Sequence, residues 1–305
     1  MIKLILLSGF LGAGKTTLMT NILTSFSDEK VGIIVNEFGE TGVDGPLLAM
    51  MGAQMTELNN GSIFCACIKD HFLRSLIDMS NRDISYLFIE PTGLADPSEM
   101  DKILETIAPM LGKGYDYRGV VCVVDAETFP KLSKVLPALT RQVEYAGAVI
   151  INKADLVDEA RIEEITAEVA ELNPNCEIIV TSRCQLDTRA LAERLSPVNK
   201  APAESTNTPE TRLYSTVLKP KGLVPVEPLR QFVEKLSENA YRIKGFLPAD
   251  NGVIAVNAVG GVLNIDPWTE ENPPLRLVVI SAVGVSIISR IAEAMCDELK
   301  DKLGL

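Results

Sequence analysis

The sequence has few histidine and aromatic residues and no long apolar stretch. It contains one histidine, one tryptophan and 5% aromatic residues, and it has no histidine-rich tract. No apolar stretch approaches the roughly 20 residues that a membrane-spanning helix needs. A strand-like run begins almost at the first residue and leaves no room for a signal peptide. We therefore expect a cytoplasmic protein without a membrane partner.

Positive charge is also in short supply. The 29 basic residues face 41 acidic ones, which gives a net charge of −12. Residues 213–305 hold 10 basic and 11 acidic side chains, so the first 212 residues carry a net charge of −11. An acidic surface repels a phosphate backbone, and nucleic acid is therefore not an expected partner.

The six cysteines do not form an obvious disulfide framework for a cytosolic chain of this length. Cys122 lies in an apolar run and is expected in the core, and Cys296 is expected in the apolar stripe of a last helix. Cys176 and Cys184 are isolated. Only Cys65 and Cys67 lie close together, which makes them the pair with chemical interest.

The most informative motif stands between an apolar run at residues 4–7 and a helical pattern that follows residue 14. The sequence from Gly9 to Thr16 fits G-x-x-x-x-G-K-T without a mismatch. Glycines in such a loop turn backbone N–H groups toward a polyphosphate, the lysine reaches the β- and γ-phosphates, and the threonine hydroxyl ligates Mg²⁺. A chance glycine-rich turn is the alternative, and the complete pattern in its strand–loop–helix context argues against it. The residues expected to bind the phosphates of a nucleoside triphosphate are Gly12, Ala13, Gly14, Lys15, Thr16 and Thr17, with Lys15 also catalytic.

Further apolar runs at residues 31–36, 85–89, 119–124, 148–151 and 177–180 alternate with helical stretches. This alternation predicts an α/β P-loop NTPase domain over residues 1–195, with a mostly parallel sheet flanked by helices. Residues 196–212 contain three prolines and no periodicity, which is typical of a linker. A smaller α+β domain is expected over residues 213–305, ending in one helix at 285–303.

Glu90 and Gly93 follow the run at 85–89 and are candidates for a second phosphate element. A carboxylate at the tip of a buried strand can hold Mg²⁺ directly or through water. Gly93 would let a backbone N–H approach the γ-phosphate. The alternative is a solvated strand end.

The run at 148–151 ends in Asn152-Lys153-Ala154-Asp155, in the order that guanine-specific GTPases use. The Asp155 carboxylate can accept hydrogen bonds from guanine N1–H and the exocyclic amine, a donor pair that adenine lacks. Lys153 would lie along the plane of the base. Ser182 follows the next strand and is expected to support the base.

Cys65 and Cys67 are predicted on one loop, just before His71, the only histidine. Two thiolates and one imidazole can chelate a soft or borderline cation such as Zn²⁺. Apolar neighbours such as Phe64 leave the alternative of two small core cysteines open.

With these motifs in place, the chain resembles the CobW/HypB/UreG-type GTPases, in their CobW-like branch. The matching stretches are residues 9–17, 35–40, 60–61, 90–97, 152–155 and 242–246. The resemblance implies slow, Mg²⁺-dependent GTP hydrolysis that assists insertion of a metal or a corrinoid cofactor into a client protein. The expected partner is a client metalloprotein or a cofactor-assembly protein. An oligomeric form of the protein is also compatible with the resemblance.

One departure from the family concerns the metal. The family usually carries Cys-x-Cys-Cys directly after the glycine that matches Gly61, and this chain keeps only the last cysteine, Cys65. Cys67 lies past the motif. Glu37 is a candidate catalytic residue or ligand, and Glu40 is a candidate ligand for Zn²⁺ or Co²⁺ together with Cys65, Cys67 and His71.

Two other functions compete with a metal-delivering GTPase. One is a nucleotide-switched protein-binding module that transfers no metal. The other is a P-loop kinase, which is disfavoured because Asn-Lys-x-Asp has no role in a kinase.

Overall fold

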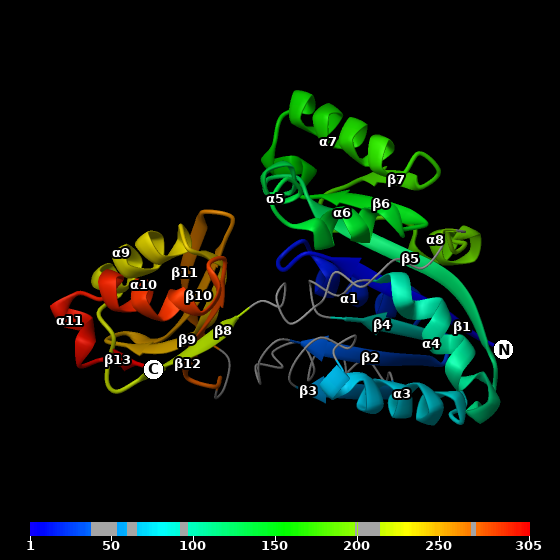
Figure 1. Ribbon diagram of the computed structural model, residues 1–305, viewed down its shortest axis with the longest axis horizontal. Coiled ribbons are helices and arrows are strands. Elements are labelled where there is room, and N and C mark those ends of the chain that lie inside the picture. The colour runs from blue at the N-terminus through cyan, green and yellow to red at the C-terminus, as the bar shows by residue number, and fades with distance from the viewer. Residues whose placement is uncertain (38–53, 60–65, 92–96, 199, 201–213, 270–272) are drawn as a thin grey trace. The chain divides into compact units, whose positions relative to one another are not determined.

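The computed structural model describes residues 1–37, 54–59, 66–91, 97–198, 200, 214–269 and 273–305 (Figure 1). The chain forms two compact units, residues 1–210 and 211–305, and each is described by itself below. The predicted linker at 196–212 lies largely outside the described residues. Within the described part of the chain, no helix is long and apolar enough to cross a membrane.

The first unit is built on a seven-stranded sheet in which every pair of neighbours is parallel, in the order β3-β2-β4-β1-β5-β6-β7. Strands β4 and β6 are buried along their whole length, because helices cover both faces of the sheet. The strands are β1 (Ile2–Gly9), β2 (Val31–Glu37), β3 (Gln54–Asn59), β4 (Tyr86–Glu90), β5 (Tyr115–Asp125), β6 (Ala148–Asn152) and β7 (Glu177–Val180). The predicted α/β fold with a parallel sheet is confirmed.

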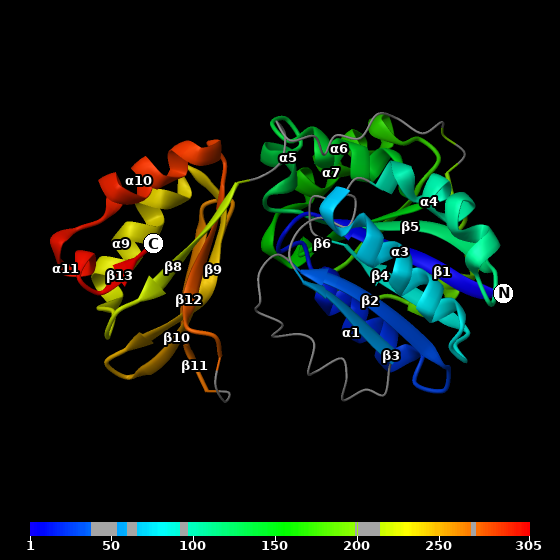
Figure 2. The same ribbon diagram turned by 60° about the horizontal axis from the view of Figure 1, so that its bottom comes forward.

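Two helices, α1 and α8, share a core on one face, where Leu18 and Ile22 pack with Leu191 and Leu195. Helices α3, α4, α6 and α7 cover the opposite face (Figures 1 and 2). The described residues of this unit form the helices α1 (Lys15–Ser25), α3 (Ala66–Ser80), α4 (Met100–Ile107), α5 (Phe129–Leu132), α6 (Pro137–Glu144), α7 (Glu159–Leu172) and α8 (Thr188–Arg194).

Strand β1 is the point at which the strand order reverses. It pairs with β4 on one side and with β5 on the other, although the chain visits β2 and β3 in between. Open parallel sheets form their ligand crevice beyond the carboxyl ends of the strands at such a point. The loop that follows Gly9 therefore lies where this fold places a ligand.

The second unit is a six-stranded antiparallel sheet in the order β11-β10-β9-β12-β8-β13. Helices α9 (Val226–Ser237), α10 (Ile287–Ala294) and α11 (Asp297–Lys300) lie on one face of it (Figure 2). A core of their apolar side chains and the strand residues beneath them holds this unit together. The strands are β8 (Ser215–Pro220), β9 (Ala240–Ala249), β10 (Gly252–Val259), β11 (Val262–Trp268), β12 (Arg276–Ser281) and β13 (Leu303–Gly304).

Three sequence-based expectations are wrong. The single helix at 285–303 is broken, because Met295 is extended (φ −68°, ψ 115°), and the break lets Leu299 enter the core and Leu303 pair with β8. Cys296 is consequently exposed rather than part of an apolar stripe. Cys67 belongs to the first turn of α3 rather than to a loop. Cys122 is buried in β5, as predicted.

Candidate functional site

The loop between β1 and α1 has the backbone of an anion-binding loop. Gly9, Gly12 and Gly14 have φ values of 134°, 82° and 114°, which side-chain-bearing residues rarely adopt. A Cβ on Gly9 would lie 2.2 Å from the carbonyl oxygen of Val123 on β5, so the loop lies tightly against the neighbouring strand. Gly14 caps α1 without a side-chain hydrogen bond, so no side chain of the capping residue covers the positive end of this helix, where an anion can bind.

Lys15 is the first residue of α1 and is 7% exposed. Its ammonium folds back over the loop and donates to the carbonyl oxygens of Gly9, at 2.9 Å, and Phe10, at 3.1 Å. Neutral carbonyls are weaker partners for an ammonium than charged phosphate oxygens. Thr16 is half-buried and Thr17 is exposed, both in the first turn of the helix.

Asn152, at the end of β6, connects the phosphate loop to the loop after β7. Its side-chain Nδ2 donates to the carbonyl oxygen of Ala13 at 2.8 Å, and its Oδ1 accepts from the backbone N–H of Cys184 at 2.9 Å. The amide is 3% exposed, so both bonds are shielded from water. A Cβ on Gly14 would lie 2.3 Å from the same Nδ2, which leaves glycine as the residue that fits there.

Cys184 belongs to this connection, and sequence analysis missed it. Its Sγ lies 3.5 Å from the carbonyl oxygen of Gly14, and the side chain is fully buried. Burial raises the pKa of the thiol to about 12. Asn21 on α1 fixes the same loop by donating to the carbonyl oxygens of Arg183 and Cys184. The sequence feature that could have identified Cys184 is its position two residues after Ser182, which was itself a predicted site residue.

Lys153 follows Asn152 with a left-handed backbone (φ 63°). Its ammonium pairs with Oδ2 of Asp125 at 2.6 Å. Asp125, at the tip of β5, was also missed as a site residue. The signal that marks it is a carboxylate at the carboxyl end of a buried strand, the same signal that selected Glu90.

Asp155 and Ser182 meet at the outer edge of the site. The Asp155 backbone N–H donates to Ser182 Oγ at 3.1 Å, and the Asp155 carboxylate is exposed. Hydrogen bonding from the Ser182 side chain, followed by bonding from a backbone N–H, holds the pKa of Asp155 below its ordinary value. The carboxylate is therefore a charged acceptor at neutral pH.

Glu90 is the last residue of β4 and is 8% exposed. Because Leu6 of β1 pairs with Ile89, Glu90 lies beside the end of β1, near the start of the phosphate loop. Glu37 ends β2 at the same edge of the sheet. Gly93 lies outside the described residues.

The predicted transition-metal ligands are only partly described. His71 is exposed on α3. Cys65 and Glu40 lie outside the described residues. Among the residues that the structure describes, no group of three histidine, cysteine, aspartate or glutamate residues is arranged to hold a metal ion.

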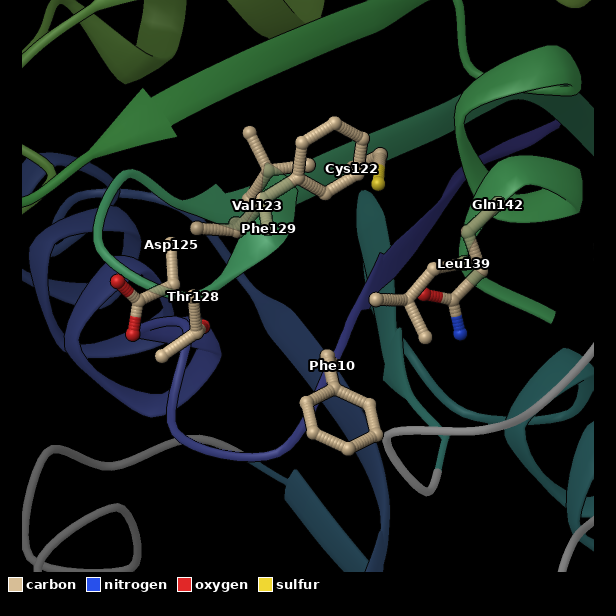
Figure 3. Close-up of a pocket in the computed structure, with 9 residues that line it drawn as sticks. Phe10, Cys122, Val123, Asp125, Thr128, Phe129, Leu139 and Gln142 are labelled. Carbon is tan, nitrogen blue, oxygen red and sulfur yellow. The ribbon is translucent and has the colours of Figure 1, made fainter. Parts of the chain in front are cut away.

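A narrow, largely apolar cavity lies beside the phosphate loop (Figure 3). Phe10 and Phe129 supply ring carbons to its wall, and Leu139 and Gln142 of α6 bound it on another side. None of the described residues that line it is a cation that could bind a phosphate. The cavity is therefore distinct in chemistry from the polar surface of the phosphate loop.

A parallel sheet, a phosphate loop at its central strand and an Asn-Lys-x-Asp turn two strands away together define a P-loop NTPase with a guanine-type base motif. Residues 3–180 match the CobW/HypB/UreG nucleotide-binding domain, and residues 213–295 match the cobalamin synthesis protein cobW C-terminal domain. The chain belongs to the CobW/HypB/UreG family.

One curated relative extends this likeness over nearly the whole chain, and others over more than half of it. Zinc chaperone YjiA of Escherichia coli (strain K12) is 28% identical over 302 residues, covering 92% of this chain and 93% of its own length. Zinc chaperone CobW of a Sinorhizobium species is 31% identical over 194 residues, 54% of each chain. Zinc-regulated GTPase metalloprotein activator 1 of Dictyostelium discoideum is 27% identical over 216 residues, 57% of this chain and 44% of its own.

Proposed function

We propose that this protein is a GTPase that couples GTP hydrolysis to the delivery of Zn²⁺ or Co²⁺ to a client metalloprotein or cofactor-assembly protein. The observation that carries the proposal is the Asn152 amide, which bonds both the phosphate loop and the loop of Ser182 and Cys184. A side chain that bonds both loops supports their assignment to a single nucleotide site. The names of the relatives, zinc chaperones and a zinc-regulated GTPase, support the part of the proposal that concerns metal delivery.

Guanine selection is assigned to Asp155. Its carboxylate is exposed at the edge of the site and ionised at neutral pH, so it can accept from N1–H and the exocyclic amine of guanine. Adenine would leave that acceptor unpaired and present a nitrogen lone pair instead, which disfavours ATP. Ser182 positions the turn by accepting from the Asp155 backbone N–H.

Phosphate binding is assigned to the backbone N–H groups of residues 12–17 and to Lys15. A polyphosphate would give the Lys15 ammonium charged oxygens in place of the carbonyls of Gly9 and Phe10. The Thr16 hydroxyl and the Glu90 carboxylate provide the hard oxygen ligands that Mg²⁺ prefers, and a bound Mg²⁺ would neutralise charge on the β- and γ-phosphates. Glu37 and Glu90 are assigned to orienting the attacking water.

Metal binding is assigned to Cys65, Cys67, His71 and Glu40. A thiolate and imidazole donor set suits Zn²⁺ and Co²⁺. The replacement of the family's first two cysteines by Ser62 and Phe64 favours one competing function, a nucleotide-switched binding module that carries no metal.

Titration with Co²⁺ separates the two functions. Thiolate-to-Co²⁺ charge-transfer absorption is expected in the wild-type protein and not in the Cys65→Ala/Cys67→Ala variant. Metal affinity should differ between GDP and a non-hydrolysable GTP analogue, by roughly 5- to 150-fold for a coupling of ~1–3 kcal/mol.

Lys15→Ala, which removes charge stabilisation of the phosphates, serves as the control without GTP turnover. Equal metal affinity in both nucleotide states, or unchanged affinity in the double cysteine variant, would favour the module without metal transfer.

A further inference from the structure

The ion pair of Lys153 and Asp125 has a geometry that the assigned roles do not explain. The Asp125 side chain is 4% exposed, whereas that of Lys153 is 32% exposed. Their atoms Oδ2 and Nζ lie 2.6 Å apart. Removing a carboxylate from water is costly unless it is paired and hydrogen-bonded. The fold thus keeps a buried anion in place at the tip of β5, and the ammonium of Lys153 accompanies it.

The carboxylate of Asp125 is held in one orientation. Its Oδ1 accepts from the backbone N–H of Glu127 at 2.9 Å, which leaves Oδ2 for the ammonium. In Figure 3 the Asp125 carboxylate points away from Leu139 and Gln142, the α6 side of the cavity. The cavity therefore does not account for this charge.

The backbone beside the pair is also tied to the guanine motif. Asp125 is the register partner of Asn152 in the sheet, and the N–H of the next residue, Ala126, donates to the Asn152 carbonyl oxygen at 3.0 Å. The position of Asp125 is thus fixed relative to the residue that precedes Lys153. Two constraints, this backbone register and the left-handed φ of 63° at Lys153, set where the lysine side chain begins.

The ion pair with Asp125 fixes the position of Nζ, at the other end of the Lys153 side chain. A lysine side chain has four rotatable bonds, and an unpaired ammonium would move among many rotamers. With Cα and Nζ both held, the four methylene groups between them are ordered before any ligand arrives. A side chain ordered in advance loses less entropy when a ligand packs against it.

We propose that Asp125 is a positioning residue for the purine ring of the nucleotide, acting through Lys153. This inference rests on the proposed function, a site for guanine nucleotides, together with the expectation from the Asn-Lys-x-Asp motif that the stem of Lys153 lies along the base. Asp125 holds the ammonium so that the apolar stem presents a fixed surface to the ring. Such packing does not depend on the groups at C2 or C6 of the purine, so Asp125 contributes to affinity, and Asp155 contributes the choice of base.

The test is calorimetric titration with GDP, which avoids turnover. Asp125→Asn keeps the size of the side chain and removes its charge, and we expect the dissociation constant to rise about tenfold, equally for GDP and inosine diphosphate. At saturating GTP, kcat should stay within about twofold, because the ring contact is the same in the ground state and the transition state. Glu127→Gln is the matched control, because that residue contributes only its backbone N–H to the pair.

A double-mutant cycle distinguishes positioning from general destabilisation. Lys153→Ala removes the stem, so Asp125→Asn added to it should weaken GDP binding no further. A folded Asp125→Asn variant with wild-type affinity would overturn the inference, and so would losses that multiply in the double variant. If Asp125→Asn does not fold, Lys153→Met serves as the second test, because methionine keeps an apolar stem and lacks the ammonium. An affinity for GDP equal to that of the wild type would overturn the role of the ion pair, whereas an affinity as low as that of Lys153→Ala would support it. A wild-type protein that binds no guanine nucleotide would instead overturn the proposed function.

Discussion

Individual side chains at this site hold backbone atoms that belong to other loops. Asn152 bonds the backbone of Ala13 and Cys184, Ser182 accepts from that of Asp155, and Asn21 donates to the loop after β7. A substitution here acts on the placement of a neighbouring loop as well as on the ligand. Variants at this scale therefore need a readout that separates chemistry from placement.

Asp155→Asn is expected to exchange the preferred base. The new amide can donate to the C2 carbonyl of xanthine, whereas it presents N–H groups to the donor pair of guanine. Affinity for GTP should fall by about 10- to 100-fold, the cost of losing hydrogen bonds to a charged group. Calorimetry with GTP and xanthosine triphosphate gives the ratio. Unchanged GTP affinity in the variant would remove Asp155 from the base site.

The thiols of this protein should react very differently at pH 8. Burial raises the pKa of Cys184 and of Cys122 to about 12, so both stay protonated and shielded in the native state. Cys296 is exposed. Iodoacetamide labelling followed by peptide mass spectrometry should modify Cys296 in minutes and Cys184 only after unfolding. Rapid native labelling of Cys184 would contradict its position against the phosphate loop.

Helices and strands show how far the sequence determines the fold. The parallel sheet was predictable because β4 and β6 are apolar over consecutive residues, a pattern that sheets covered on both faces require. Strand β11 was not, because its residues alternate between half-buried and exposed, and Asp266 and Pro267 interrupt its apolar pattern. The broken last helix depends on the tertiary placement of Leu299, which no local pattern encodes.

The residues of the candidate site were likewise predictable where they belong to a contiguous motif, and not where they depend on contacts between distant parts of the sequence. Lys15, Asn152 and Asp155 belong to contiguous motifs whose spacing itself indicates the chemistry, and their site roles remain predictions. Asp125 and Cys184 acquire their contacts from residues 28 and 170 positions away in the sequence. Such contacts exist only after the sheet has formed. A sequence pattern can therefore mark Asp125 as a carboxylate at the end of a strand, but it cannot reveal that its partner is Lys153.

At the element scale, we expect Asp187 to support the site through α8. Its side chain caps the helix by accepting from the backbone N–H of Ala190 at 2.9 Å. Asp187→Ala should lower the free energy of unfolding by about 1 kcal/mol, and Asp187→Ser, which retains an acceptor, by much less. Urea denaturation measures both. An alanine variant as stable as the wild type would show that the cap contributes nothing.

At the scale of the whole molecule, the two compact units have separate hydrophobic cores. A ligand that binds one folded unit stabilises that unit by mass action. GDP at about 100 times its dissociation constant should add ~2.7 kcal/mol to the first unit. Scanning calorimetry should therefore show a GDP-dependent transition for residues 1–210 and a second that GDP does not move. A single transition shifted as a whole would show that the units unfold together.

The long sequence separation within the site has a consequence for synthesis on the ribosome. Gly14 and Cys184 are in contact at the phosphate loop, 170 residues apart. At about 5–20 residues per second, translation takes roughly 10–30 s to add that length of chain. During this interval the nascent chain carries a phosphate loop whose Ala13 carbonyl lacks its Asn152 partner until the later strand emerges. Nucleotide binding during translation should therefore begin only after Cys184, 170 residues beyond Gly14, has left the exit tunnel.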